Sequence, residues 1–190
     1  MPDEYAGRLI KSEWEVRTMT DKKAARQIIV ENHYARGVSC WAVYLHGLFR
    51  VGEDKCYGVA WWIPPIQGAA KATYPENWHG VLALSRLVVL PGVPKNAATF
   101  LMSHSRQLID RVRWPCLVTY ADEWQGHKGG IYMADNWENW GRGKPAPTYV
   151  KDGKLVSKYQ DGHTSSHAEM LAKGCEFVGN FCKIKFVRFN

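Results

Sequence analysis

The stretch VLALSRLVVLPGVPKNAATF, residues 81–100, decides the fold. The run that opens it is apolar on both faces apart from Ser85 and Arg86, as expected for a central strand that is buried on both sides. A turn with two prolines and one glycine ends this strand. Asn96 is placed to cap the helix that follows, which we predict over residues 97–112.

The next buried strand is predicted at CLVTYA, residues 116–121. Because a helix connects it to the strand at 81–90, the two strands are expected to be parallel and the crossover right-handed. Ligands of such sheets bind beyond the carboxyl ends of the strands, so the turn at 91–96 and the loop at 122–130 are expected to lie side by side. The inner stripe of the connecting helix is predicted to comprise Leu101, Ser105, Leu108 and Val112.

The other segments predict one more long helix and further strands. A helix over 22–34 can be capped by Thr20 or Asp21, and its apolar stripe places His33 on the inward side. Residues 1–190 are predicted to form a single domain of the α/β (α+β) class, with a mixed, mostly antiparallel sheet flanked by helices. The further strands are predicted at 12–17, 40–45, 56–63 and 181–189.

The composition indicates a globular protein with a basic surface. Hydrophobic residues make up 46% of the chain, and no apolar run is long enough to span a membrane. The five cysteines include no C-x-x-C pair, so a disulfide framework is not expected and a reducing cytoplasm fits best. A net charge of +7 with nine Trp and nine Tyr favours contact with nucleic acid, although a protein with many core aromatics would have the same composition.

Two charged residues lie at notable positions in the predicted sheet, one inside a buried strand and one at the carboxyl end of a strand. Arg86 interrupts an apolar strand, and a guanidinium there needs a carboxylate or a phosphate as its partner. Asp122 directly follows the strand at 116–121, at the edge where α/β enzymes place reactive groups. Asp122 is therefore the predicted partner of Arg86 or a catalytic group, and its simpler role would be to cap the turn after the strand.

The segment after this strand contains further candidates. GHKGG, residues 126–130, offers free backbone N–H groups to an anion, but it lacks the spacing of a P-loop. His127, Lys128 and Tyr132 lie close to Asp122 along the chain, which favours a functional corner.

The end of the first long helix has a histidine and a tyrosine, His33 and Tyr34. A buried, hydrogen-bonded histidine is the ordinary explanation of an inward His33. A histidine beside a cleft can also shuttle protons, and both interpretations stay open.

Three segments together resemble one known family. They read NHYARG at 32–37, LSRLVV at 84–89 and YADEWQGHKGGIYMADNW at 120–137. Over roughly residues 25–140 the chain resembles the Mom-like DNA modification proteins of bacteriophages. The resemblance implies a GNAT-like acetyltransferase fold with a splayed, parallel central strand pair. It also implies that adenine in duplex DNA receives a carbamoylmethyl (glycinamide-type) group at its exocyclic amine, which protects the DNA from host restriction enzymes.

The resemblance also implies which residues form the site. The four positions expected to be catalytic are His33, Tyr34, Asp122 and Tyr132, while Arg86 is expected to bind substrate or donor. Asp122 would accept a proton from the amine, and Tyr34 or Tyr132 would protonate the departing group. The residues themselves suggest further contacts with substrate or donor: Lys95, Asn96, His127 and Lys128.

The identity of the donor is left open by the turn after the central strand. Acetyltransferases of this fold bind the pyrophosphate of coenzyme A in a glycine-rich turn, whereas PGVPKNAAT at 91–99 has a single glycine. Lys95 and the helix N-terminus at Asn96 can still contact a phosphate. The expected donor is an acyl-CoA or another glycyl donor such as an aminoacyl-tRNA. A metal-assisted route, with iron(II) and His33 as a ligand, is a further alternative.

Two other functions remain as alternatives. The chain would be a CoA-dependent N-acetyltransferase of a protein or small-molecule amine, or a DNA-binding protein without catalytic activity. In the leading interpretation a flipped adenine enters a pocket, and basic side chains hold the duplex. The pocket aromatics are expected among Trp61, Trp62 and Trp137. The basic contacts are expected from Arg142, Lys144, Lys151 and Lys154, and less strongly from Lys183 and Lys185.

Overall fold

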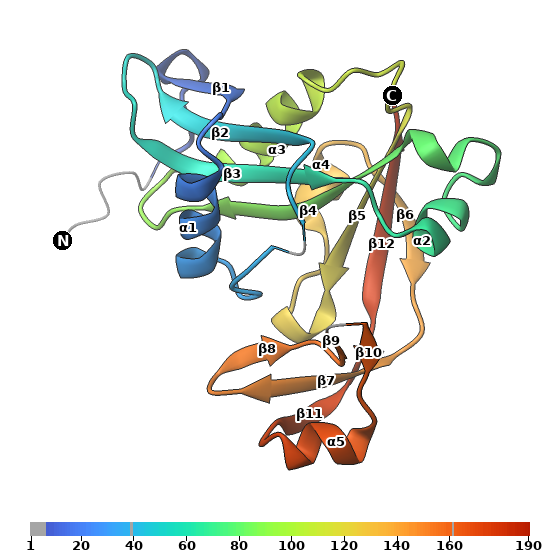
Figure 1. Cartoon of the computed structure of the whole chain (residues 1–190). Helices are drawn as coiled ribbons and strands as arrows, with labels where there is room; N and C mark the ends of the chain where they lie inside the picture. The colour runs from blue at the N-terminus through green and yellow to red at the C-terminus, as the bar shows by residue number, and fades with distance from the viewer. Residues whose placement is uncertain (1–6, 39, 161) are drawn as a thin grey trace.

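The computed structural model describes residues 7–38, 40–160 and 162–190. A seven-stranded sheet forms the body of the molecule (Figure 1). Its strands are β1 (Trp14–Thr18), β2 (Tyr44–Arg50), β3 (Cys56–Ile63), β4 (Val81–Val89), β5 (Cys116–Asp122), β6 (Glu138–Arg142) and β12 (Lys183–Phe189). They lie in the order β1–β2–β3–β4–β5–β12–β6, and only β4 and β5 are parallel. The predicted class, with a mostly antiparallel sheet and one parallel pair, is confirmed.

Helices cover both faces of this sheet. The helices of the main body are α1 (Lys22–Asn32), α2 (Gln67–Lys71), α3 (Ala97–Gln107) and α4 (Gly130–Ala134), with 3₁₀ turns η1 (Lys11–Glu13), η2 (Pro75–Gly80) and η3 (Glu123–Gln125). α1 and α2 pack on one face, called here the α1 face, where Ile63 of β3 contacts the clusters beneath both helices. α3 packs on the opposite face, the α3 face, over the largest apolar cluster, which Tyr132 of α4 also contacts.

The parallel pair opens along its length. β4 and β5 pair only at their beginnings, from Val81 opposite Cys116 to Ala83 opposite Val118. Beyond these residues no pairing joins the two strands in the described part of the chain. The central pair is therefore splayed, and the carboxyl ends of the two strands are not neighbours.

A bulge in β4 changes which side chains face α1. Trp61 of β3 pairs with Arg86, whereas Trp62 pairs with Leu84, so Ser85 is an extra residue. Side chains alternate along a strand, and one extra residue reverses the alternation. Arg86 is thereby brought to the α1 face, and Leu84 stays in the core on the α3 face.

A second, smaller sheet was not predicted from the sequence. It comprises β11 (Glu176–Phe181), β7 (Ala146–Lys151) and β8 (Lys154–Val156), in this order. α5 (His167–Ala172) packs Met170 against Tyr149 and Cys175 beneath it, beside the short pair β9 (Tyr159–Gln160) and β10 (His163–Thr164). In Figure 1 this small-sheet lobe lies below the main sheet and is joined to it through β6 and β12.

Other predicted elements lie close to their expected positions. β3 has its predicted bounds, and Asp21 caps α1 by accepting two N–H groups of the first turn. All five cysteines are free thiols, as expected. No helix in the described part of the chain is both long and apolar enough to cross a bilayer.

Two predicted boundaries are wrong. β2 begins at Tyr44 and not at residue 40. α3 ends at Gln107, because Asp110 accepts two backbone N–H groups in a turn that follows the helix. Leu108 and Val112, predicted on the inner stripe, are 48% and 92% exposed.

The three tryptophans expected around a flipped base belong to the core instead. Trp61 and Trp62 are fully buried on opposite faces of β3, and Trp137 is buried near α3. Their indole N–H groups all have acceptors inside the protein. None of the three lines the cavities described below.

Candidate functional site

A cavity of about 400 Å³ opens where β4 and β5 diverge, called here the splay cavity. Its volume lies in the roughly 300–1,000 Å³ range of small-molecule sites. Its walls come from three segments: the residues after α1, the strands β4 and β5, and the loop leading into α4. Five of the nine expected site residues line it, namely His33, Tyr34, His127, Lys128 and Tyr132.

The end of α1 brings His33 to this cavity. Asn32 is the last helical residue, and His33 has extended backbone, while its N–H still bonds the carbonyl of Ile29. Arg36, with φ 44°, donates its N–H to the His33 carbonyl and closes the turn. His33 Nδ1 accepts the N–H of Ala35 at 3.1 Å, so Nε2 carries the proton of the neutral ring.

His33 is held in its neutral form. Burial lowers its pKa to about 4, with smaller contributions from the charges of Arg86 and His127. The ring is stacked on Tyr34, with 4.3 Å between the ring centroids. At neutral pH His33 therefore offers a hydrogen-bond donor at Nε2 and no free lone pair.

Tyr34 and Asp122 form a pair that retains a proton. Burial raises the pKa of Tyr34 to about 12, and the carboxylate of Asp122 contributes as a neighbouring charge and as a hydrogen-bond partner. Asp122 is 6% exposed, and its Oδ1 accepts the N–H of Trp124 at 3.1 Å. Asp122 thus caps the turn after β5 and also holds the Tyr34 hydroxyl, while Tyr34 lines the cavity.

Arg86 is anchored by neutral oxygens. Its Nε donates to the Gly37 carbonyl at 2.7 Å, and its Nη1 donates to the carbonyl and hydroxyl oxygens of Ser85 at 2.7 and 3.2 Å. The expected ion pair with Asp122 is not found, and Arg86 forms no salt bridge within the described residues. Burial lowers the pKa of Arg86, as expected for a cation without a carboxylate partner.

Tyr132 forms the opposite wall. Its ring packs on Phe186 and Trp137, at centroid distances of 5.1 and 6.0 Å. Burial raises the pKa of Tyr132, and the Thr119 hydroxyl is its hydrogen-bond partner. Gly129 precedes α4 with φ 75°, and a Cβ there would overlap the Phe186 ring. The glycine therefore allows α4 to approach β12 and brings Tyr132 to the cavity.

His127 and Lys128 lie at the rim. Both are exposed, and the His127 ring meets Tyr34 edge-on, with 5.7 Å between centroids. The backbone N–H of His127 bonds the Asp122 carbonyl at 3.2 Å, which fixes the loop against β5. The rim of the cavity therefore has a histidine and a lysine within reach of an anionic group.

Lys95 and Asn96 lie in a different hollow. This hollow, of about 380 Å³, is bordered by Arg8 as well and shares no lining residue with the splay cavity. Asn96 Oδ1 accepts the N–H of Leu9 at 2.7 Å and makes no capping bond to α3. The prediction that the turn at 91–96 lies beside the loop after β5 is not met, because the two strands diverge before they end.

Thr119 and Tyr120 are cavity residues that sequence reasoning missed. Thr119 is buried, and its Oγ1 donates to the Leu84 carbonyl at 3.1 Å across the splay. A hydroxyl within an otherwise apolar strand was the available signal for Thr119. Tyr120 alternates with it on the opposite face of β5, and nothing in the local sequence marked it.

Comparisons with solved structures identify the fold. A Bacillus subtilis acetyltransferase in complex with CoA has a TM-score of 0.54 at 6% identity, with 94% of this chain and 98% of that chain covered. The ribosomal-protein-alanine N-acetyltransferase from Brucella melitensis has a TM-score of 0.54 at 13% sequence identity. The match covers 93% of this chain and 99% of that chain. A mosquito arylalkylamine N-acetyltransferase like 5b has a TM-score of 0.53 at 11% sequence identity. The match covers 93% of this chain and 100% of that chain. At these identities the likeness shows the GNAT-like fold alone.

The family is decided by sequence. The model of the Mom protein family matches residues 13–189, nearly the whole chain. The chain belongs to the Mom family. No curated protein sequence matches it. Membership in this family and the acetyltransferase fold identify it as a transferase.

The donor set of this Mom-family chain does not fit the iron(II) alternative. The described residues include no group of three or more His, Cys, Asp or Glu side chains that could hold a metal ion. His33 Nδ1 already accepts a backbone N–H, so Nε2 presents a proton where a metal ligand needs a lone pair. His33 therefore presents a hydrogen-bond donor at Nε2.

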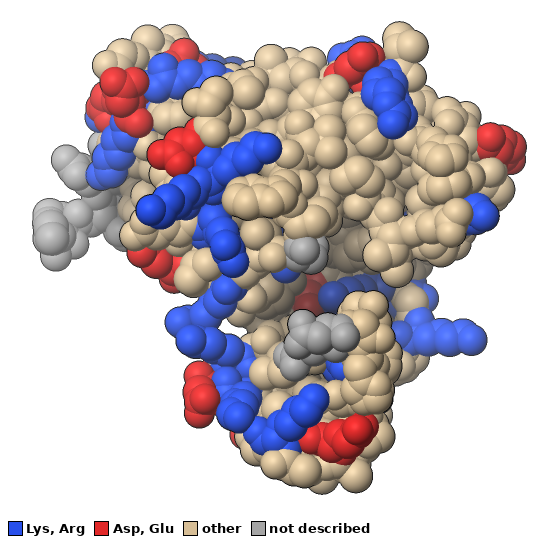
Figure 2. All heavy atoms as spheres, viewed as in Figure 1, with Lys and Arg blue, Asp and Glu red and all other residues tan. Residues whose placement is uncertain are grey.

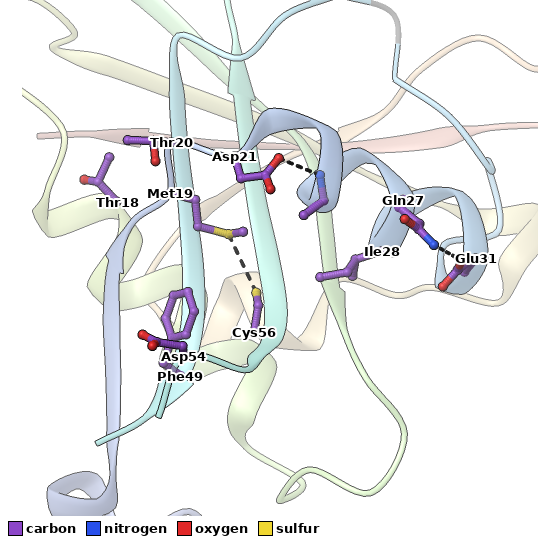
Figure 3. Close-up of a pocket in the computed structure, with 11 residues that line it drawn as sticks. Thr18, Met19, Thr20, Asp21, Gln27, Ile28, Glu31, Phe49, Asp54 and Cys56 are labelled. Atoms are coloured by element: carbon purple, nitrogen blue, oxygen red, sulfur yellow. Dashed lines mark hydrogen bonds between the residues drawn. The ribbon is translucent and has the colours of Figure 1, made fainter. Parts of the chain in front are cut away.

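A further hollow, of about 520 Å³, lies along the outer flank of α1 (Figure 3). None of the expected site residues lines it. Its acidic groups have partners: Asp21 caps α1, Glu31 accepts from a glutamine, and Asp54 pairs with an arginine. The sulfur atoms of Met19 and Cys56 lie 3.6 Å apart in its floor. The acidic groups of this hollow are thus paired within the protein.

The basic residues expected to hold DNA differ in their surroundings. Arg142 is ion-paired with Glu123, with 2.6 Å between Nε and Oε1. Lys151 donates to a main-chain carbonyl after α5, whereas Lys144 and Lys154 are exposed. Figure 2 shows lysine and arginine side chains along the small-sheet lobe and beside the hollow that separates it from the main body.

Proposed function

We propose that this chain modifies adenine in double-stranded DNA at its exocyclic amine, adding a carbamoylmethyl (glycinamide-type) group that protects the DNA from restriction enzymes. Membership in the Mom family and the transferase fold support this class of activity. The observation that carries the proposal is the Tyr34–Asp122 pair at the wall of the splay cavity, flanked by His33 and Tyr132. These groups can hold and move protons beside a ligand-sized space.

The substrate sets two demands on such a site. The lone pair of the exocyclic amine is delocalised into the ring, so the amine must lose a proton as the new bond forms. The amine is also inaccessible within the base stack, so the adenine must be flipped out of the duplex. The splay cavity, open at the rim with His127 and Lys128, is where we place the flipped base.

The proton of the amine is assigned to the Tyr34–Asp122 pair. With a pKa of about 12, Tyr34 does not persist as an anion, so it acts as a relay. Its hydroxyl receives the proton of the amine while its own proton passes to Asp122. Tyr132, whose pKa is also raised, keeps its proton and can give it to the departing group. His33 Nε2–H is the neutral donor for the carbonyl oxygen of the transferred group.

The hollow beside α3 suits the phosphates of a donor. Asn96 leaves the first-turn N–H groups of α3 without a side-chain cap, and Arg8 and Lys95 border the space in front of them. An acyl-CoA would supply a carbonyl that is activated as a thioester. We therefore propose acyl-CoA as the donor to test first, and a glycyl-tRNA as the second.

The chemistry of the product separates two courses of the reaction. Direct acyl transfer from a glycyl donor joins the amine nitrogen to the carbonyl carbon and gives N–CO–CH₂–NH₂. The carbamoylmethyl product, N–CH₂–CO–NH₂, has a bond from nitrogen to the methylene carbon. It forms when the amine displaces a leaving group X from the methylene carbon of a glycinamide donor, X–CH₂–CO–NH₂, with loss of X and of one amine proton. The two products are isomers of equal mass, so their fragmentation, and not their mass, identifies the course.

The test is mass spectrometry of nucleosides from DNA of cells that express the chain. We expect a deoxyadenosine derivative heavier by C₂H₃NO. A methylene retained on the base after fragmentation identifies the carbamoylmethyl product, and a carbonyl retained there identifies direct acyl transfer from a glycyl donor. Purified chain with plasmid DNA, and either glycyl-CoA or glycyl-tRNA, identifies the donor. Tyr34→Phe, which removes only the hydroxyl, is the matched inactive control. Unmodified adenine in every arm, from a folded chain, would contradict the proposal.

The fold itself favours one other function, a CoA-dependent N-acetyltransferase acting on a protein or small-molecule amine. The same experiment separates the two. Acetylation of a peptide or amine panel by purified chain and acetyl-CoA, without any change in DNA, would favour this alternative.

A further inference from the structure

The strands β5, β12 and β6 leave part of the α1 face uncovered. α1 packs over β3 and β4, and α2 packs over the beginnings of β4 and β5. α2 and the segment after it also reach β12, where Val187 packs with Ala70 and Lys185 Nζ donates to the Ala72 carbonyl at 3.4 Å. Tyr120 of β5 and Trp140 of β6 stay exposed on this face. An uncovered sheet face usually bears polar side chains, because apolar rings there contact water.

Two aromatic rings and a lysine form a row across these strands. Tyr120 on β5 is directly opposite Lys185 on β12. The Nζ of Lys185 lies 4.7 Å from the centre of the Trp140 ring on β6. Tyr120 and Trp140 are 38% and 43% exposed. Glu138 accepts the indole N–H of Trp140 at 3.1 Å, which holds the ring in place. We call this row of Tyr120, Lys185 and Trp140 the platform.

The platform is continuous with the site. Tyr120 also lines the splay cavity, so the platform begins where the cavity ends. Tyr120 and Trp140 are two strand spacings apart, about 10 Å, which is the length of roughly three stacked nucleotide steps. Bases next to a flipped adenine can reach the platform where their pairs open, so the strand that enters the cavity is single-stranded over these steps.

We propose that the platform binds the bases flanking the flipped adenine, with base stacking on Tyr120 and Trp140 and a phosphate contact from Lys185. The proposal rests on the proposed modification of DNA. Stacking rings interleaved with cations are the common form of single-stranded nucleic acid sites. The charge fits as well, because Lys183, two residues before Lys185 and therefore on the same side of β12, is exposed. A second copy of this chain, with a net charge of +7, would bring like charge to this face.

The experiment measures binding of a fluorescein-labelled single-stranded oligodeoxynucleotide by anisotropy, with the full chain. Tyr120→Ala and Trp140→Ala are each expected to weaken binding by about 5- to 100-fold, the effect of losing one stacked base. Trp140→Tyr, which keeps a ring, should stay within a few-fold of wild type. Equal thermal melting of the variants shows that the fold is retained.

The surface offers a matched control. Trp41 is 64% exposed and has Lys22 at 5.8 Å from its ring centre, so it forms the same Lys–Trp pair away from the platform. Trp41→Ala is expected to bind the oligonucleotide like wild type. The platform proposal would be wrong if Trp140→Ala bound the oligonucleotide with wild-type affinity. It would also be wrong if Trp41→Ala lost as much affinity as Trp140→Ala. A dimer in sedimentation that Trp140→Ala dissolves without any change in DNA binding would overturn it as well.

The platform and the proposed function fail in different ways. A wild-type chain that modifies adenine while Trp140→Ala keeps full affinity overturns the platform and leaves the function standing. A wild-type chain that loses oligonucleotide affinity on Trp140→Ala, but never modifies adenine with any donor, supports the platform and overturns the function.

Discussion

Two arginines are held inside this molecule in different ways. Arg106 of α3 is buried, and its Nε and Nη2 bond the two carboxylate oxygens of Asp135 at 3.0 and 3.2 Å. Asp135 also accepts the indole N–H of Trp137, so charge and hydrogen bonds are matched within the core. Arg86 has only carbonyl and hydroxyl oxygens as partners in the described part of the chain. Arg86 does not line the splay cavity, although its charge contributes to the lowered pKa of His33 in the cavity wall.

Two histidines repeat the contrast. His46 is 1% exposed and bonds Ser105 at 2.7 Å, and burial lowers its pKa to about 4. His33 has the same lowered pKa but lines the cavity, and its Nε2–H has no acceptor among the described residues. A polar group that is matched inside the protein stabilises the fold. A polar group with hydrogen-bonding capacity left at a cavity wall is available for chemistry.

The largest effect is expected from breaking the matched pair. Asp135→Asn leaves Arg106 buried without a counter-charge, and we expect a loss of about 3–5 kcal/mol in the free energy of unfolding. Urea denaturation measures it, with the exposed Asp152→Asn as the control. Arg86→Met removes an unmatched charge and should cost much less. Equal losses for the Asp135 and Arg86 variants would refute the contrast between the two arginines.

Asp122→Asn tests the acid–base pair of the splay cavity. Asn keeps the oxygen that accepts the N–H of Trp124, so the turn should be retained, but it cannot take the proton from Tyr34. We expect adenine modification to fall about a hundredfold or more, with little loss of stability. The modified fraction of adenine is measured against Asp54→Asn, an exposed surface change. Near wild-type activity of Asp122→Asn would show that the carboxylate takes no part in the transfer.

The two glycines before α4 should differ in their tolerance. A Cβ at Gly129 would overlap Phe186, and φ is positive there, whereas a Cβ at Gly130 meets nothing within 4 Å. Gly129→Ala is expected to lose about 1–3 kcal/mol of stability through overpacking, and Gly130→Ala much less. Thermal and urea unfolding of both variants test this, and similar stabilities would mean that α4 can shift without cost.

The smallest effect is a dependence of stability on pH. The pKa of His46 is about 4 in the folded state and 6.5 in the unfolded state, so the unfolded chain binds more protons between these values. Stability is complete above pH 6.5 and is lost as the pH falls toward 4, on the order of 1–2 kcal/mol from His46 by pH 5. His46→Gln does not titrate, so its unfolding free energy should fall less over this window. If the unfolding free energy of His46→Gln fell with pH as steeply as that of the wild type, protonated His46 would be accommodated in the folded state without cost.

Local patterns in the sequence predicted much of the site. An apolar run ending in an acid placed Asp122 after a strand, and a pair of glycines placed Tyr132 at the start of a short helix. The stripe of α1 indicated that His33 points inward. The small-sheet lobe was missed, because its short strands are mostly exposed and lack an apolar run.

By itself, the sequence determined the order of the main elements and the placement of His33, Tyr34 and Asp122 at element ends. Helix caps, prolines and glycines that end an element, and apolar periodicity all act between residues only a few positions apart, so the sequence shows them directly. Only the tertiary structure decided that these ends meet across the splay and that Arg86 has no carboxylate partner among the described residues. The reason is the extra residue Ser85 in β4, which reverses the faces of the strand, together with the early divergence from β5. Both depend on the strands that pair with β4, and pairing between distant segments leaves no local pattern.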